Sequence, residues 1–145
     1  MKVITLHQPW ASFMVSNPPV KSFETRSWKT NYRGELWIHA SKKGTRDGRL
    51  VFDKIMRAFP DRISAVASSF DELPFGAIVG SVTVVNCHHA QPIGDNLFLS
   101  DLLEWTCGDF SAGRFAWGCM RPYQFDTPIP AKGYQGIWNY EPVES

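Results

Sequence analysis

One stretch, residues 76–87 (GAIVGSVTVVNC), constrains the fold of this chain more than any other. It is dense in β-branched residues, which fit the pleated surface of a sheet, so we predict a strand there. A second strand is predicted at Gly34–Ala40, where two kinds of side chain alternate. The alternating sets are Leu36, Ile38 and Ala40 on one face and Glu35, Trp37 and His39 on the other.

Helical and strand patterns follow one another along the rest of the chain. The expected helices cover residues 9–16, 45–59, part of 61–75, and 97–105, and the second is capped by Thr45 or Asp47. The expected shorter strands cover residues 21–28, 115–119, 123–125 and 137–140, with Pro122 as the break between the second and the third. About five short strands with inserted helices predict an α+β fold around a small mixed barrel. No linker or internal repeat interrupts the 145 residues, so we expect a single domain over residues 1–145.

Charge is distributed unevenly along this nearly neutral chain. Residues 1–60 hold 11 of the 15 Lys and Arg but 4 of the 14 Asp and Glu, whereas residues 61–145 hold the remaining 4 basic and 10 acidic residues. Such asymmetry fits a basic surface patch that meets an anionic partner. It fits two solvated faces of opposite sign equally well, and both interpretations stay open here.

Several classes of protein lack their signatures in this sequence. The three cysteines, Cys87, Cys107 and Cys119, are sparse and odd in number, which argues against a disulfide framework and for a reducing, cytoplasmic location. They form no close ligand pair of the kind that zinc requires, so we expect no metal, and we expect no cofactor. The N-terminal apolar run is too short for a signal peptide, and no apolar run has the length of a membrane span.

The segment KSFETRSW, residues 21–28, concentrates Lys21, Glu24, Arg26 and Trp28 just before a predicted strand. On a regular strand, Glu24, Arg26 and Trp28 would share one face, and Phe23, Thr25 and Ser27 the other. One interpretation is a structural ion pair between Glu24 and Arg26. The other is a cleft in which Lys21 and Arg26 meet anionic or carbonyl oxygens, while Glu24 orients them or accepts protons from a base edge.

Five blocks of sequence, in order, resemble an ASCH domain, a member of the PUA-like superfamily. The blocks are LHQPWA, KSFETR, YRGELWIHASK, GAIVGSVTV and PIPAKGYQGIW. The family pattern is G-x-K-x-x-E-x-R, and Lys21, Glu24 and Arg26 match its three functional positions. Pro19 stands where the pattern has glycine, so the turn that enters the motif differs.

The resemblance implies a PUA-like small mixed β-barrel of about five to six strands, with flanking and inserted short helices and a cleft beside the motif. Members of the family are generally thought to bind RNA or other nucleic acid. A smaller relative of this fold is an amidohydrolase that deacetylates acetylcytidine and has Thr at the position of Glu24. A carboxylate is a much poorer acyl acceptor than an activated hydroxyl, so we do not expect that activity to transfer.

We therefore expect a nucleic-acid-binding module, for RNA in the first place, with a base or a nucleoside in the cleft. The expected ligand-binding residues are Lys21, Glu24, Arg26, Trp28, Gln8, Trp10, His39, Ser41 and Lys42. Lys42, Lys43 and Arg46 would meet phosphates, and a base would stack on Trp28 or Trp10.

Some of these residues have ordinary structural alternatives. Gln8, His39 and Ser41 could bond a base edge, or could satisfy only local turns and strands. The sequence favours an exposed turn lysine at Lys132, although this residue could also close the rim of the cleft.

Two other functions remain open on the sequence. The first is a small hydrolase that acts on a modified nucleoside or on RNA, with Glu24 as the general base and Lys21 stabilising an oxyanion. The second is a protein-interaction module that uses the aromatic surface. Whether the chain is an enzyme, and its oligomeric state, are not decided by the residues.

Overall fold

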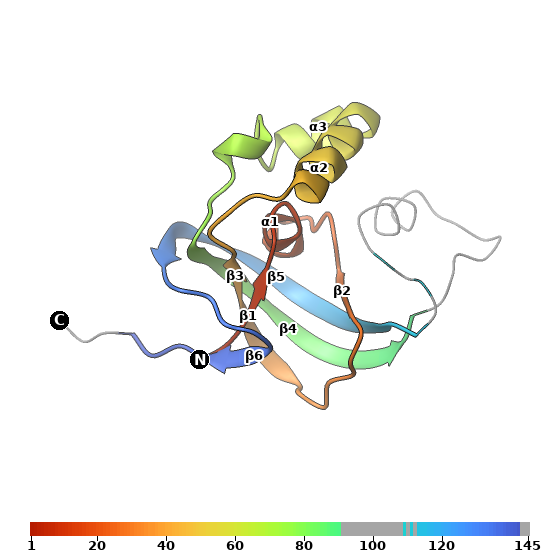
Figure 1. Ribbon diagram of the computed structural model, residues 1–145, viewed down its shortest axis with the longest axis vertical. Coiled ribbons are helices and arrows are strands. Elements are labelled where there is room, and N and C mark those ends of the chain that lie inside the picture. The colour runs from red at the N-terminus through yellow and green to blue at the C-terminus, as the bar shows by residue number, and fades with distance from the viewer. Residues whose placement is uncertain (91–108, 110, 112, 143–145) are drawn as a thin grey trace.

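In the computed structural model, which describes residues 1–90, 109, 111 and 113–142, six strands form one mixed sheet in the order β2-β5-β4-β3-β1-β6. The strands are β1 (Lys2–Leu6), β2 (Phe23–Arg26), β3 (Gly34–Ala40), β4 (Ala77–His89), β5 (Phe115–Pro130) and β6 (Ile137–Asn139). Neighbouring strands are antiparallel, except that β1 and β3 run parallel. The sheet curls into a half-barrel (Figure 1), which confirms the predicted α+β small-barrel fold.

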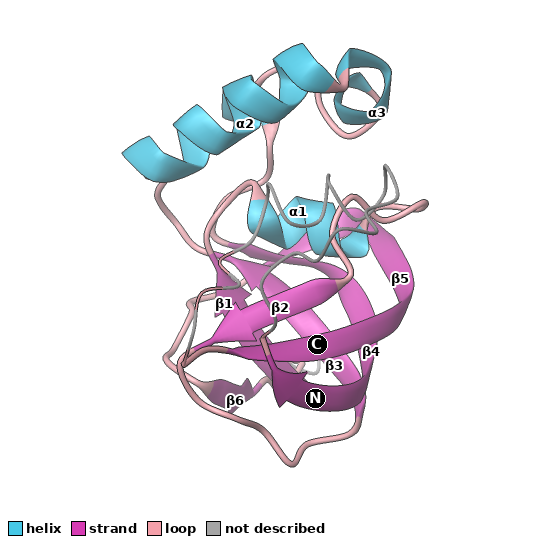
Figure 2. Cartoon of the chain, turned by 90° about the vertical axis from the view of Figure 1, so that its right-hand side faces the viewer, coloured by secondary structure: helices cyan, strands magenta, loops and turns pink. Residues whose placement is uncertain are grey.

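Short helices cover one side of this sheet. They are α1 (Trp10–Val15), α2 (Arg46–Ala58), α3 (Pro60–Ser64) and the 3-10 turn η1 (Phe70–Glu72). Figure 2 shows α1 between the sheet and the layer that α2 and α3 form. The Thr45 side chain accepts a hydrogen bond from the Gly48 N–H at 2.9 Å, as the predicted N-cap of α2 requires.

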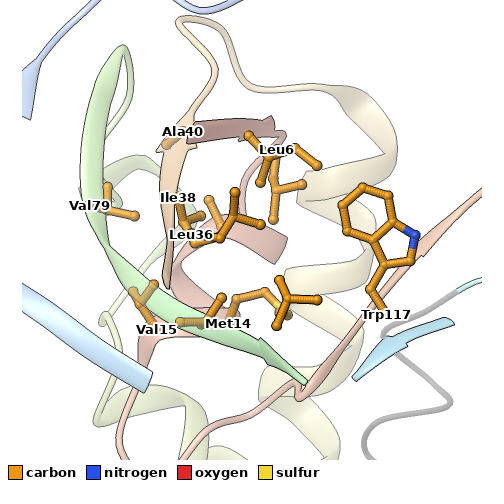
Figure 3. Packing of buried hydrophobic residues seen from close by; sticks show 12 residues of the cluster. Leu6, Met14, Val15, Leu36, Ile38, Ala40, Val79 and Trp117 are labelled. Atoms are coloured by element: carbon orange, nitrogen blue, oxygen red, sulfur yellow. The ribbon is translucent and has the colours of Figure 1, made fainter. Parts of the chain in front are cut away.

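The main core lies where α1 packs onto the concave face of the sheet. Alternate residues of β3, Leu36 and Ile38, are each 1% exposed, and they pack with Met14 and Val15 of α1 (Figure 3). Trp117 of β5 is fully buried in the same cluster. The predicted alternation along Gly34–Ala40 is therefore confirmed on its apolar face.

A second core lies between α1 and the outer helices. Its buried members are Phe13, Val20, Phe52, Ile55, Ile63, Phe70 and Leu73. Phe13 comes from α1 and stacks on Phe52 of α2, with the ring centroids 6.4 Å apart. The apolar stripe of α2 thus serves as a packing surface, and Phe52 attaches α2 to α1.

The structure corrects the prediction of two strands separated by Pro122. One strand, β5, runs from Phe115 to Pro130, and its pairing with β4 shifts register between Met120 and Tyr123. Arg121 has a φ of 52° at this bulge. A bulge leaves one residue outside the ladder, so Pro122, which has no N–H, interrupts no inter-strand hydrogen bond there.

Two further expectations have different outcomes. The strand predicted at residues 21–28 is shorter at both ends, because β2 covers only Phe23–Arg26. The helix predicted at residues 97–105 lies outside the described residues. Among the residues that the structure describes, no helix is long and apolar enough to cross a membrane.

The curl of the sheet brings the edge strand β2 close to β1. The Arg26 guanidinium at the end of β2 donates from Nη2 to the Thr5 carbonyl oxygen of β1 at 3.0 Å. These two strands are separated by three others in the sheet order. The contact therefore joins distant parts of the sheet, and the candidate site lies around it.

Candidate functional site

Two pockets adjoin this contact, and both are lined by Thr5 and Arg26. The first, which we call the motif pocket, has a volume of about 600 Å³. It is lined by Thr5, Leu6, His7, Trp10, Lys21, Glu24, Thr25, Arg26, Asp47, Leu50, Val51, Asp109 and Arg114. The second, the turn pocket, has a volume of about 1200 Å³. It is lined by Thr5, Arg26, Trp28, His39, Ser41, Lys42, Phe75 and residues 76 and 131–136.

The three charged residues of the sequence motif meet in the motif pocket. Glu24 is 9% exposed, and its two carboxylate oxygens have different partners. Oε1 accepts from the Thr25 N–H at 3.0 Å, and Oε2 accepts from Arg26 Nε at 3.2 Å. Lys21, which precedes β2, is 1% exposed and lines the same pocket. The Glu24–Arg26 ion pair, one of the two alternatives in the sequence, is present, and both of its residues line a pocket.

A second arginine, which the sequence pattern did not indicate, lines the motif pocket. Arg114 precedes β5 and donates from Nη2 to the Thr25 carbonyl oxygen at 2.9 Å. Its Nε lies 3.3 Å from Asp109 Oδ2. The Ser111 hydroxyl donates to Asp109 at 2.6 Å, and this bond, together with the nearby arginine, holds the pKa of Asp109 below its usual value. The motif pocket therefore combines three cations with three carboxylates.

The two candidate stacking residues lie in different pockets. Trp10 at the start of α1 lines the motif pocket. Trp28 follows the end of β2 and lines the turn pocket, where 38% of its surface is exposed. Its ring meets Trp117 edge-on, with centroids 4.8 Å apart, so the indole is held in place by the core. A fixed and partly exposed indole is suited to stacking on a base.

His39 lies beneath the turn pocket in a buried hydrogen-bond chain. Its Nε2 is 2.7 Å from the Ala131 carbonyl oxygen, which can only accept, so Nε2 carries the proton. Nδ1 then accepts from the Thr5 hydroxyl at 3.2 Å, and that hydroxyl accepts from Trp138 Nε1 at 3.0 Å. Burial lowers the pKa of His39. The neutral ring thus holds the Ala131–Gly136 turn against the sheet.

Of the other predicted polar residues, some line the turn pocket and one is buried in the interior. Ser41 and Lys42 follow β3 and line the turn pocket, as Lys132 does. Gln8 lines neither pocket and is fully buried. Its amide N–H groups donate to the Ser12 hydroxyl at 2.7 Å and to the Pro74 carbonyl oxygen at 2.8 Å. The contacts of Gln8 thus join α1 to the segment before β4.

No local sequence motif indicated that Thr5 and Arg114 would line the site. Thr5 is a polar residue in the apolar run Val3–Leu6, and Arg114 is one of the 4 basic residues beyond residue 60. Thr5 reaches the site because the sheet curls, and Arg114 reaches it because β5 pairs with β2. In the described part of the chain, no three His, Cys, Asp or Glu side chains are grouped so that they could hold a metal ion.

Comparisons with known proteins agree with the motif. The family model of the ASCH domain matches residues 4–129. Activating signal cointegrator 1 from Mus musculus is 26% identical over 149 aligned residues, which cover 95% of this chain and 22% of that protein. The protein of the same name from Homo sapiens is 25% identical over the same share of each chain. The chain therefore spans about a fifth of the length of these curated relatives.

Proposed function

The chain belongs to the ASCH domain family, and on that premise we propose that it is a nucleic-acid-binding module whose preferred ligand is RNA. The observation that carries the proposal is the meeting of Lys21, Glu24 and Arg26 along one pocket of about 600 Å³. A pocket of this size suits a single base or nucleoside. Its mixed charges offer donors and acceptors to the polar edges of a base.

The hydrogen bonds of Glu24 support a positioning role for its carboxylate. Both of its oxygens accept from groups of the protein, Thr25 N–H and Arg26 Nε. A carboxylate that is held in this way orients the arginine. This favours binding over the hydrolase alternative, in which Glu24 would be the general base.

The basic residues around the two pockets support an anionic ligand. Arg26, Lys42 and Lys132 line the turn pocket, next to the exposed ring of Trp28. Lysine and arginine side chains commonly bind the phosphates of single-stranded RNA, while its unstacked bases rest on aromatic rings. The two pockets together therefore suit a single strand better than a duplex.

The proposal is tested by titrating fluorescently labelled single-stranded RNA, and DNA of the same sequence, with the protein. If two to three phosphates are contacted, affinity should fall about 7- to 20-fold between about 50 and 200 mM salt. Arg26→Gln should weaken binding, whereas Arg57→Gln, on the exposed side of α2, should not. Lack of binding at low salt, or an affinity that does not change with salt, would refute the proposal.

A further inference from the structure

The two pockets differ sharply in their charged residues. The motif pocket has Lys21, Arg26 and Arg114 balanced by Glu24, Asp47 and Asp109. The turn pocket has Arg26, Lys42 and Lys132, and no Asp or Glu among the described residues that line it. A balanced set of charges suits a neutral group with donors and acceptors, such as a base. A set of cations alone attracts an anion.

The three cations of the turn pocket come from three separate segments. Arg26 ends β2, Lys42 follows β3, and Lys132 follows β5. Arg26 Nε donates to Glu24, and Nη2 lies within 3.2 Å of both Glu24 Oε2 and the Thr5 carbonyl oxygen, which leaves Nη1 of the five N–H donors of a guanidinium. Nη1 is therefore the group that can donate to a ligand, and Arg26 lines both pockets.

The turn that carries Lys132 is held rigidly over the sheet. The Ala131 N–H donates to the Gly76 carbonyl oxygen at 3.1 Å, and His39 Nε2 donates to the Ala131 carbonyl oxygen at 2.7 Å. Gly133 lies so close that a Cβ there would be 2.8 Å from Thr5 Oγ1. Gly136 closes the turn with a φ of 66°, a conformation that favours glycine. The backbone that carries Lys132 is thus fixed before any ligand arrives.

We propose that the turn pocket binds a phosphate of the ligand whose base lies in the motif pocket, with Arg26 between the two. This inference rests on the proposed function and narrows the ligand class. The ligand is a phosphorylated nucleotide, either a nucleoside monophosphate or one nucleotide of a strand. A free nucleoside fills only half of the site. The phosphate is bound by Lys42, Lys132 and Arg26 through charge-assisted hydrogen bonds.

The experiment compares the four ribonucleosides with their 5′- and 3′-monophosphates by calorimetric titration of the full chain. For the base that binds most tightly, one of the two monophosphates should bind at least about tenfold more tightly than the nucleoside. In the double variant Lys42→Gln/Lys132→Gln, this ratio should fall below about threefold.

A matched double variant controls for net charge. Lys54→Gln/Arg57→Gln removes the same two charges from the exposed side of α2, and it should leave the ratio unchanged. The phosphate inference is refuted, and the proposed function is not, in either of two cases. In the first, RNA binds as proposed but nucleoside and monophosphate bind equally well. In the second, both double variants lower the affinity ratio to the same extent. If neither RNA nor any nucleotide binds, the proposed function fails with it.

Discussion

Replacing Glu24 with glutamine tests whether the carboxylate holds the site together. The two oxygens of Glu24 accept from two donors, Thr25 N–H at 3.0 Å and Arg26 Nε at 3.2 Å. Glutamine has nearly the same shape, but one of its two terminal atoms is an NH₂ group that only donates. Whichever way the amide is turned, one N–H donor of the protein then faces another donor. Glu24→Gln therefore loses one hydrogen bond as well as the ion pair.

The expected loss of stability follows from these contacts. A hydrogen bond that involves a charged group contributes about 1.5–3 kcal/mol. Water relieves part of the loss, because the Arg26 side chain is 26% exposed. We therefore expect a loss of about 1.5–2 kcal/mol in the free energy of unfolding. With a denaturant slope of about 2 kcal/mol per molar, the urea midpoint should fall by about 0.7–1 M.

The assay is equilibrium urea unfolding followed by tryptophan fluorescence. Glu141→Gln, at an exposed position, removes the same charge and should change stability by less than about 0.5 kcal/mol. In an Arg26→Gln background, Glu24→Gln should cost less than it does alone, with a coupling of about 1 kcal/mol. An unchanged midpoint for Glu24→Gln, or costs that simply add, would refute the reasoning.

Two further predictions concern the network beneath the turn pocket. Gly133→Ala would place a methyl group 2.8 Å from both Thr5 Oγ1 and His39 Cε1. The free energy of unfolding, measured in urea, should therefore fall by about 1–3 kcal/mol, and a fall below about 0.5 kcal/mol would contradict this packing. The lowered pKa of His39 means that, as pH falls below the ordinary value of 6.5, the unfolded chain takes up a proton that the folded chain resists. The melting temperature should therefore fall as pH is lowered from about 7.5 to about 5.5, and it should fall less steeply in His39→Gln. Equal slopes of melting temperature against pH in the two proteins would contradict this role of His39.

Local sequence patterns were sufficient to predict the elements whose structure depends on near neighbours. The strand predicted over Gly34–Ala40 has the bounds of β3 and buries its apolar face, and Thr45 caps α2 as expected. The motif spacing also indicated that Lys21, Glu24 and Arg26 belong together, and they line one pocket. That they bind a ligand remains a prediction.

The sequence could not indicate contacts between segments that are far apart along the chain. Arg114 donates to the Thr25 carbonyl oxygen, 89 residues away in sequence, and a backbone acceptor carries no residue type to recognise. The burial of Gln8 depends likewise on the Pro74 carbonyl oxygen, 66 residues away. Pro122 misled the strand prediction, because a bulge tolerates proline and nothing in the local sequence shows where a bulge will fall.

The position of α1 has a consequence for how the molecule opens. This helix of six residues is covered on two sides, by the sheet through Met14 and Val15 and by the outer helices through Phe13. Neither layer can separate from α1 without exposing residues that are at most 1% exposed. Backbone amides in α2 and in β4 should therefore exchange with solvent through one shared opening event, as a single foldon.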